Sequence, residues 1–292
     1  MPSSIIYLNG QLVEAAQARI SVLDQGFLHG YGAFETMRAW NGKVFRLDEH
    51  LARLTHAAEE IGILLGGQMD ILAQAVRATL EANDLPDARV RVTVTAGEGP
   101  GYPELPAPGP PTIVVLASAL PPETDEELAR GYTAIVATRQ RDSQSILARL
   151  KSTSYLENLL ARWEAKQKGA DEAIILNERG CLAECAMANI FVVEGRRLAT
   201  PSPDCGLLRG ITRQAVIEIA TDRDFPVDET WFLAENLKHV SEVFITNSIH
   251  GVMPVTSIDG RQVGDGQPGA ITRLIHQGYQ ELVAHELGLG TR

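Results

Sequence analysis

The chain has 292 residues, of which 45% are hydrophobic and 22% are charged, and its formal net charge is −11. This length is enough for a sizeable core in one large or two modest domains, and the negative charge disfavours nucleic acid and acidic membranes as partners. No apolar run reaches the length of a membrane span, and the first residues lack a signal-peptide pattern. Three cysteines without CxxC spacing fit a reducing environment, so we expect a cytoplasmic protein.

The first forty residues predict a sheet built from hairpins. IIYLNGQLV turns at an Asn-Gly pair, which is typical of a tight hairpin, and residues 20–23 predict a short edge strand. Residues 33–40 predict a longer strand. Phe34 and Arg38 stand an even number of positions apart on it, so they should emerge on the same face.

Two helices are predicted next. Asp48 could cap the first, in which leucine and isoleucine recur at helical spacing, and Arg53 lies off that apolar stripe. A lone arginine on an amphipathic helix is usually solvated, although its forked guanidinium also suits a phosphate. The second helix spans about residues 71–82.

A strand with one apolar face follows, since Val90, Val92 and Val94 alternate with Arg89 and Arg91. The two arginines could bind a substrate carboxylate or simply face water. Residues 97–111 are rich in glycine and proline and predict a loop, and TIVVLASAL predicts a buried strand. We place an N-terminal α/β domain at residues 1–120, a polar linker at 121–128 and a larger second domain at 129–292.

In the second half, YTAIVATR predicts a strand, and Lys151 follows the segment ILARL and precedes a helix that closes at Gly169. DEAIILN predicts another strand. NIFVV and RRLATP then form a hairpin around Glu194-Gly195. Near the end, a buried strand runs into Thr246-Asn247-Ser248, where short polar side chains and backbone N–H groups could hold an anion. An amphipathic helix closes the chain.

The segment GLLRGITRQAVIEIA predicts a second anion site. Gly210 allows the backbone to approach a ligand closely, and Thr212 stands at the N-cap or in the first turn of the helix that follows. Free N–H groups and a hydroxyl at a helix start favour a phosphate. The histidines form no convincing metal site, so we expect no metal.

The stretch from Glu184 to Arg213 resembles the signature of the class IV aminotransferases, and the resemblance extends over nearly the whole chain. That family uses pyridoxal 5'-phosphate in fold type IV and includes branched-chain aminotransferases, D-amino-acid aminotransferases and 4-amino-4-deoxychorismate lyases. The positions that match the signature are Glu184, Ala186, Asn189, Ile190, Phe191, Leu198, Thr200, Leu208, Gly210, Ile211 and Arg213.

The resemblance implies a set of cofactor-binding residues. Lys151 stands where the family carries its Schiff-base lysine, and it would also move the substrate proton. Glu184 would keep the pyridine nitrogen protonated, so that the ring can accept electron density. The phosphate would be held by Arg53, the Ile211–Thr212 turn and Ser248. Tyr155 would approach the ring hydroxyl.

The resemblance also implies substrate residues and an architecture. Phe34, Arg38, Arg91, Ile249 and His250 would line the substrate pocket, with Arg38, Arg89 and Arg91 as alternative partners of a carboxylate. The implied fold is α/β in two domains with the cofactor between them, as in D-amino-acid aminotransferase, and relatives are homodimers. The implied partners are a small-molecule amino donor and a 2-oxo acid acceptor.

Three functions remain open at this point. We favour an aminotransferase that acts on a branched-chain-type amino acid, a D-amino acid or an (R)-amine through a Lys151 aldimine. The alternative is 4-amino-4-deoxychorismate lyase, which releases pyruvate and 4-aminobenzoate, because both reactions begin with removal of the α-proton. A non-catalytic relative is the second alternative, and it would require the cofactor residues to be degraded, which they are not.

Overall fold

The computed structural model describes residues 4–100, 102, 104–107, 109–120 and 124–290. The described chain forms two compact units. The first contains the residues up to 120 together with the short segments 150–155 and 286–290, and the second contains the rest. Both units mix helices and sheet, which confirms the α/β class. None of the helices in the described part combines the length and apolarity that a membrane crossing requires.

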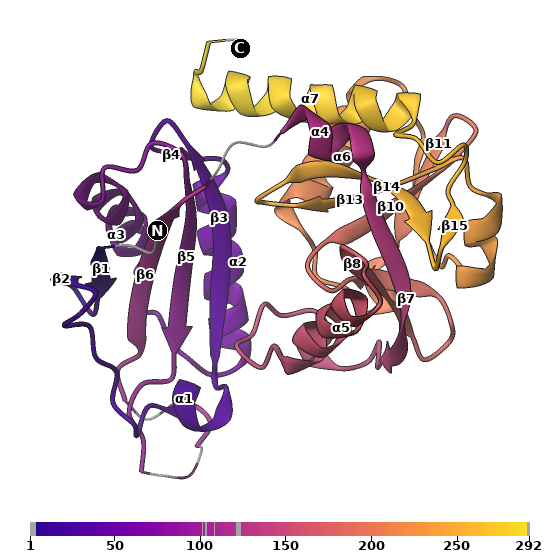
Figure 1. The fold of residues 1–292 in the computed structure, drawn as a ribbon. Helices are drawn as coiled ribbons and strands as arrows, with labels where there is room; N and C mark the ends of the chain where they lie inside the picture. Colours follow the sequence, from indigo (N-terminus) through magenta and orange to yellow (C-terminus); the bar gives the residue numbers. More distant parts are fainter. Residues whose placement is uncertain (1–3, 101, 103, 108, 121–123, 291–292) are drawn as a thin grey trace. The chain divides into compact units, whose positions relative to one another are not determined.

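The first unit is built on a six-stranded antiparallel sheet with the order β2-β1-β6-β5-β3-β4 (Figure 1). Helices α2 and α3 pack against this sheet and against each other. The bounds are β1 (Ile5–Leu8), β2 (Gln11–Glu14), α1 (Gln25–His29), β3 (Gly32–Trp40), β4 (Lys43–Val44), α2 (Leu47–Glu60), α3 (Met69–Ala82), β5 (Ala88–Thr95) and β6 (Thr112–Ala119).

The alternation in β5 explains how this sheet is covered. Val90, Val92 and Val94 are fully buried in the core shared with the helices, whereas Arg89 is exposed and Arg91 is half-buried on the opposite face. The pairing of β3 with β5 places Arg38 directly opposite Arg89. Directly paired residues lie on one face of a sheet, so the face opposite the helices carries the aromatic and cationic side chains.

The second unit is built on a nine-stranded mixed sheet, in which β12-β11-β10-β13-β14-β7-β8-β9 form one path and β15 pairs with β14. The bounds are α4 (Asp125–Arg130), β7 (Tyr132–Arg141), η1 (Ile146–Ala148), α5 (Leu156–Gln167), β8 (Glu172–Asn177), β9 (Leu182–Cys185), β10 (Asn189–Glu194), β11 (Arg197–Pro201), η2 (Pro203–Cys205), α6 (Ile211–Asp222), β12 (Val227–Thr230), η3 (Ala234–His239), β13 (Glu242–Asn247), β14 (Gly251–Ile258), β15 (Arg261–Gln262) and α7 (Ala270–Leu287), whose last two residues fall in the first unit.

Two local expectations differ from the structure. Residues 20–23 form a turn rather than an edge strand, because Asp24 caps α1 through a bond from Gly26 N and redirects the chain. Asp48 lies in the first turn of α2, which begins one residue earlier, after the left-handed Arg46. Of the expected linker 121–128, residues 121–123 lie outside the described part, and α4 begins at Asp125.

Candidate functional site

Lys151 lies in the first unit, where its segment runs beside the start of β3. Lys151 O accepts a hydrogen bond from Phe34 N at 2.9 Å, and Thr153 N donates to Gly32 O at 2.8 Å. A Cβ on Gly32 would lie within 3.1 Å of Val94 O and of the Thr153 hydroxyl, so this close approach requires glycine. The backbone therefore fixes the position from which the lysine side chain extends.

The Phe34 ring is the centre of a cluster that includes Lys151. Lys151 Nζ lies 4.9 Å from the ring centre, Arg91 Cζ lies 3.8 Å from it, and the Tyr155 ring meets it edge-on at 5.2 Å. Burial and the charge of neighbouring Arg89 lower the pKa of Arg91. The structure thus brings together four of the expected site residues. Arg38 lies farther along β3, with its guanidinium 4.7 Å from the centre of the Trp40 ring.

Arg53 forms a buried ionic group with two residues that the sequence analysis did not single out. Arg53 Nε donates to Glu35 Oε1 at 2.7 Å and Nη2 donates to Oε2 at 2.8 Å, while His50 Nδ1 lies 2.7 Å from Glu35 Oε2. The signal was present in β3, because the alternation there predicts a core position and Glu35 occupies it between Ala33 and Met37.

In the second unit, the buried carboxylate of Glu184 is held by three donors. Arg141 Nη1 donates to Oε1, and Oε2 accepts from Asn189 Nδ2 at 3.3 Å and from Leu208 N at 3.1 Å. Arg141 is itself buried and is also bonded to Asn158 Oδ1. A buried carboxylate needs such partners. The sequence does not single out Arg141 and Asn158, because they lie in β7 and α5, far from Glu184 along the chain.

Asn189 links Glu184 to the start of α6. Its Nδ2 also donates to Leu208 O at 2.8 Å, and a Cβ on Gly210 would overlap its Oδ1. Gly210 is the N-cap of α6 and supplies no capping side chain, so the first-turn amides, which include Ile211 and Thr212, have no side-chain cap from it. The positive end of the helix dipole therefore lies close to a fixed carboxylate and suits an anion.

The turn after β13 contains Ser248, Ile249 and His250. Asn247 Oδ1 accepts hydrogen bonds from Ile249 N at 2.9 Å and His250 N at 2.8 Å, so two of the amides expected for an anion site already bond within the turn. Thr246 pairs with Asn189 across the sheet, and its hydroxyl is buried without a hydrogen-bond partner among the described residues. An orphaned buried hydroxyl beside Asn189 fits a polar guest.

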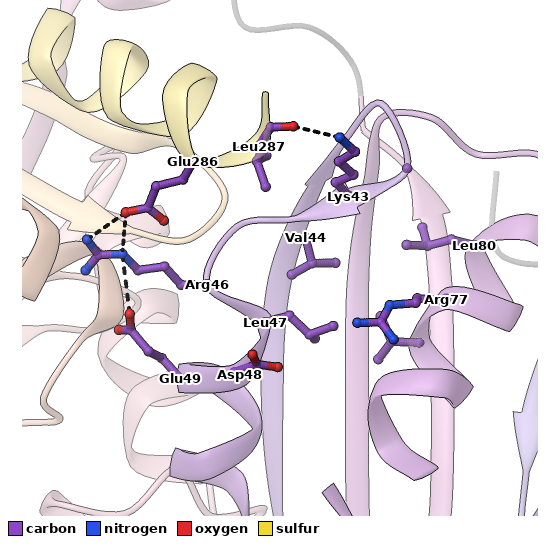
Figure 2. A pocket seen from close by; sticks show the side chains of 12 residues that line it. Lys43, Val44, Arg46, Leu47, Asp48, Glu49, Arg77, Leu80, Glu286 and Leu287 are labelled. Atoms are coloured by element: carbon purple, nitrogen blue, oxygen red, sulfur yellow. Dashed lines mark hydrogen bonds and ion pairs between the residues drawn. The ribbon is translucent and has the colours of Figure 1, made fainter. Parts of the chain in front are cut away.

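The first unit also contains a groove, which is lined by other residues. Figure 2 shows its lining from β4, the start of α2, α3 and residues 286–287. Lys43 Nζ donates to Leu287 O at 2.8 Å, and Arg46 forms an ion pair with Glu286 at 3.0 Å (Figure 2). None of the expected site residues lines this groove.

Comparison with known proteins gives a consistent result. The family model for amino-transferase class IV matches residues 32–258. A Methanocaldococcus jannaschii protein, provisionally named a branched-chain-amino-acid aminotransferase, is 35% identical over 95% of this chain and 96% of its own length. The D-alanine aminotransferase of Staphylococcus epidermidis is 33% identical over 95% of this chain and 97% of its own.

Solved structures share the fold. The branched-chain amino acid aminotransferase of Escherichia coli superposes with a TM-score of 0.92 at 30% identity, covering 97% of this chain and 96% of that one. A second branched-chain enzyme, solved with pyridoxamine 5'-phosphate, superposes at 0.91 with 27% identity and covers 97% and 95%. The fold is therefore that of the fold type IV enzymes, and class IV aminotransferases use pyridoxal phosphate. The chain belongs to the class IV aminotransferase family and is an enzyme of the transferase class.

Proposed function

We propose that this enzyme attaches pyridoxal 5'-phosphate to Lys151 and moves an amino group from an amino acid to a 2-oxo acid. The observation that carries the proposal is the Glu184 carboxylate, which is buried and held by Arg141, Asn189 and Leu208. Three donors keep it in one place, beside residues that lead into α6. This is the group that a protonated pyridine nitrogen needs as a partner.

The phosphate would be held by Arg53, by the Ile211–Thr212 turn and by Ser248. The residues present fit such a guest. The start of α6 has no capping side chain, and the Thr246 hydroxyl, two residues before Ser248, is buried without a described partner. A full positive charge, amide dipoles and hydroxyls together suit a phosphate that serves as an anchor.

Bound pyridoxal phosphate supplies a ring that withdraws electrons and so stabilises negative charge at the substrate Cα. Glu184 would hold a proton at the ring nitrogen. The Lys151 amine would take the proton from the substrate Cα and act as the general base and acid of the site. Tyr155, which packs against Phe34 at 5.2 Å, would lie beside the ring hydroxyl.

The substrate would meet Phe34, Arg38, Arg91, Ile249 and His250. Among the three candidate arginines, Arg91 is favoured as the carboxylate partner because it contacts the same Phe34 ring as Lys151. Relatives named for branched-chain amino acids and for D-alanine leave both kinds of donor open, and they favour transamination over the lyase reaction. We also propose a homodimer, and a cytoplasmic location that suits three unpaired buried cysteines.

The test is the visible spectrum of the purified enzyme, followed by half-reactions with L-leucine, D-alanine and (R)-1-phenylethylamine. One of these donors should bleach the band of the lysine-bound cofactor and yield the matching carbonyl product. Lys151→Ala should lose both band and turnover, whereas Lys168→Ala, just after the end of α5, should keep them. Pyruvate release from 4-amino-4-deoxychorismate, with no response to the three amines, would show the lyase instead.

A further inference from the structure

We infer that Glu35 is a positioning residue which, together with His50, holds the Arg53 guanidinium in one orientation for the cofactor phosphate. The inference rests on the proposed function, because it takes Arg53 as a phosphate ligand. It adds two residues to the site that touch neither the substrate nor the cofactor.

The geometry of the contact fixes the guanidinium. Arg53 gives Nε to one oxygen of Glu35 and Nη2 to the other, at 2.7 and 2.8 Å, so the carboxylate and the guanidinium are held edge to edge. Such two-point contacts define the plane of the guanidinium as well as its distance. His50 stands one helical turn before Arg53 on α2, and its Nδ1 lies 2.7 Å from Glu35 Oε2.

The charges of the group are settled by its surroundings. Burial alone would raise the pKa of Glu35, but the charge of Arg53 and the hydrogen bond from His50 outweigh it and hold that pKa well below its usual range. Burial lowers the pKa of His50, so the ring is neutral at pH 7 and donates Nδ1–H to Glu35. The result is one buried anion, one cation and one neutral donor.

Exposure separates the roles of the three side chains. Glu35 and His50 are 0% and 2% exposed, whereas Arg53 is 15% exposed. The part of the group that solvent can reach therefore belongs to the Arg53 side chain. A buried ion pair is a weak source of stability, since apolar residues of the same size are often as stable. An acid at this core position of β3 is better explained by what it does to Arg53.

The experiment compares the affinity of the enzyme for pyridoxal 5'-phosphate with its affinity for pyridoxal. Both aldehydes use the same lysine, so the ratio of the two affinities isolates the phosphate contacts. Glu35→Gln removes the anion and one acceptor oxygen. It should weaken pyridoxal phosphate binding about tenfold, the scale of one lost charged hydrogen bond, while pyridoxal binding changes less than about twofold. In an Arg53→Ala background, Glu35→Gln should have no further effect on the ratio.

His50 supplies a second, milder variant. His50→Asn keeps an N–H donor near the Nδ1 position and should leave the ratio of pyridoxal phosphate affinity to pyridoxal affinity close to the wild-type value, whereas His50→Leu should lower this ratio.

Equal losses of affinity for both aldehydes, or a Glu35→Gln loss that persists without Arg53, would overturn the inference. If the wild-type enzyme binds pyridoxal phosphate and Arg53→Ala loses nothing, the inference also fails while the proposed function stands. If the wild-type enzyme binds neither aldehyde at Lys151, the proposed function itself fails.

Discussion

Glu172 is a buried acid at the start of β8 that the proposed chemistry does not use. Burial raises its pKa to about 7 from an ordinary value of 4.5, although the Ala173 amide donates to its Oε1 at 2.9 Å. Between these two pH values the folded chain binds more protons at this site than the unfolded chain does. The contribution of Glu172 to the free energy of unfolding therefore falls as pH rises from about 4.5 to 7, and it is constant above that range.

The matched variant is Glu172→Gln, which keeps an acceptor oxygen for the Ala173 amide and cannot ionise. The free energy of unfolding of the wild-type chain should fall relative to the variant by on the order of 3 kcal/mol between pH 4.5 and 7.5. Urea unfolding of both proteins across this range measures the difference, and all other titrating groups cancel in the comparison. A difference that does not change with pH would show that Glu172 stays ionised in the folded protein.

Arg141 is the buried cation that compensates the Glu184 charge. Arg141→Met leaves that carboxylate in the interior with only two neutral N–H donors, Asn189 Nδ2 and Leu208 N, so it should lower the free energy of unfolding by about 3–5 kcal/mol. Arg141→Met combined with Glu184→Leu should recover much of this loss, because no charge is then left unpaired. Arg179→Met is the control, since Arg179 is exposed, forms an ion pair with exposed Glu178 and lies over the Trp231 ring. Urea midpoints that fall equally for Arg141→Met and Arg179→Met would contradict the prediction.

At the scale of elements, the start of α6 depends on the absence of a side chain at Gly210. The residue has φ −72° and ψ 138°, a conformation open to any residue, so glycine is needed here for space rather than for backbone freedom. A Cβ would push against Asn189 Oδ1, and Asn189 bonds both Glu184 and Leu208. Gly210→Ala should therefore displace Asn189 and cost about 1–3 kcal/mol of stability.

The same variant should weaken binding of pyridoxal phosphate, because both Glu184 and the first turn of α6 lose a fixed neighbour. Thermal unfolding and a cofactor titration measure the two effects. Gly290→Ala is the control, since a Cβ at Gly290 meets nothing within 4 Å. If Gly210→Ala lowers stability but leaves the cofactor affinity unchanged, the start of α6 does not bind the phosphate.

Most regular elements follow from sequence periodicity, because their pattern is local. The hairpin at Asn9-Gly10 forms with both residues at positive φ, and β5 shows the predicted alternation of buried valines and outward arginines. Residues 20–23 have the composition of a strand, but the Asp24 cap of α1 turns them instead. Composition describes what a segment can form, whereas its neighbours decide between turn and strand.

The same distinction between local sequence pattern and packing of elements applies to the candidate site. Parity in β3 predicts that Phe34 and Arg38 share a face. The pairing of β3 with β5, which parity within one strand does not predict, adds Arg91, whose Cζ lies 3.8 Å from the centre of the Phe34 ring. The roles of Lys151 and Glu184 come from resemblance to the family pattern and stay predictions. Glu35 and Arg141 could not be paired with Arg53 and Glu184 from sequence, because each contact joins two elements whose packing no local pattern encodes.

At the scale of the whole molecule, the proposed cofactor residues divide between two units with separate cores. Segment 150–155, with Lys151, belongs to the first unit although the chain on both sides of it belongs to the second. A ligand that binds the proposed residues would stabilise the segments that carry them by mass action. At a concentration one hundred times Kd, the stabilisation is about 2.7 kcal/mol, which slows amide exchange through cooperative opening about a hundredfold.

Hydrogen exchange with and without pyridoxal phosphate tests these assignments. Protection should rise in segment 150–155 and α2 of the first unit, and also at the start of α6 and in residues 246–250 of the second. Pyridoxal should protect segment 150–155 but leave the start of α6 nearly unchanged, because it lacks the phosphate. Lys151→Ala, tested with the same two ligands, controls for attachment at other lysines. A segment that gains no protection does not hold the cofactor, and the assignment of its residues as cofactor ligands would then be wrong.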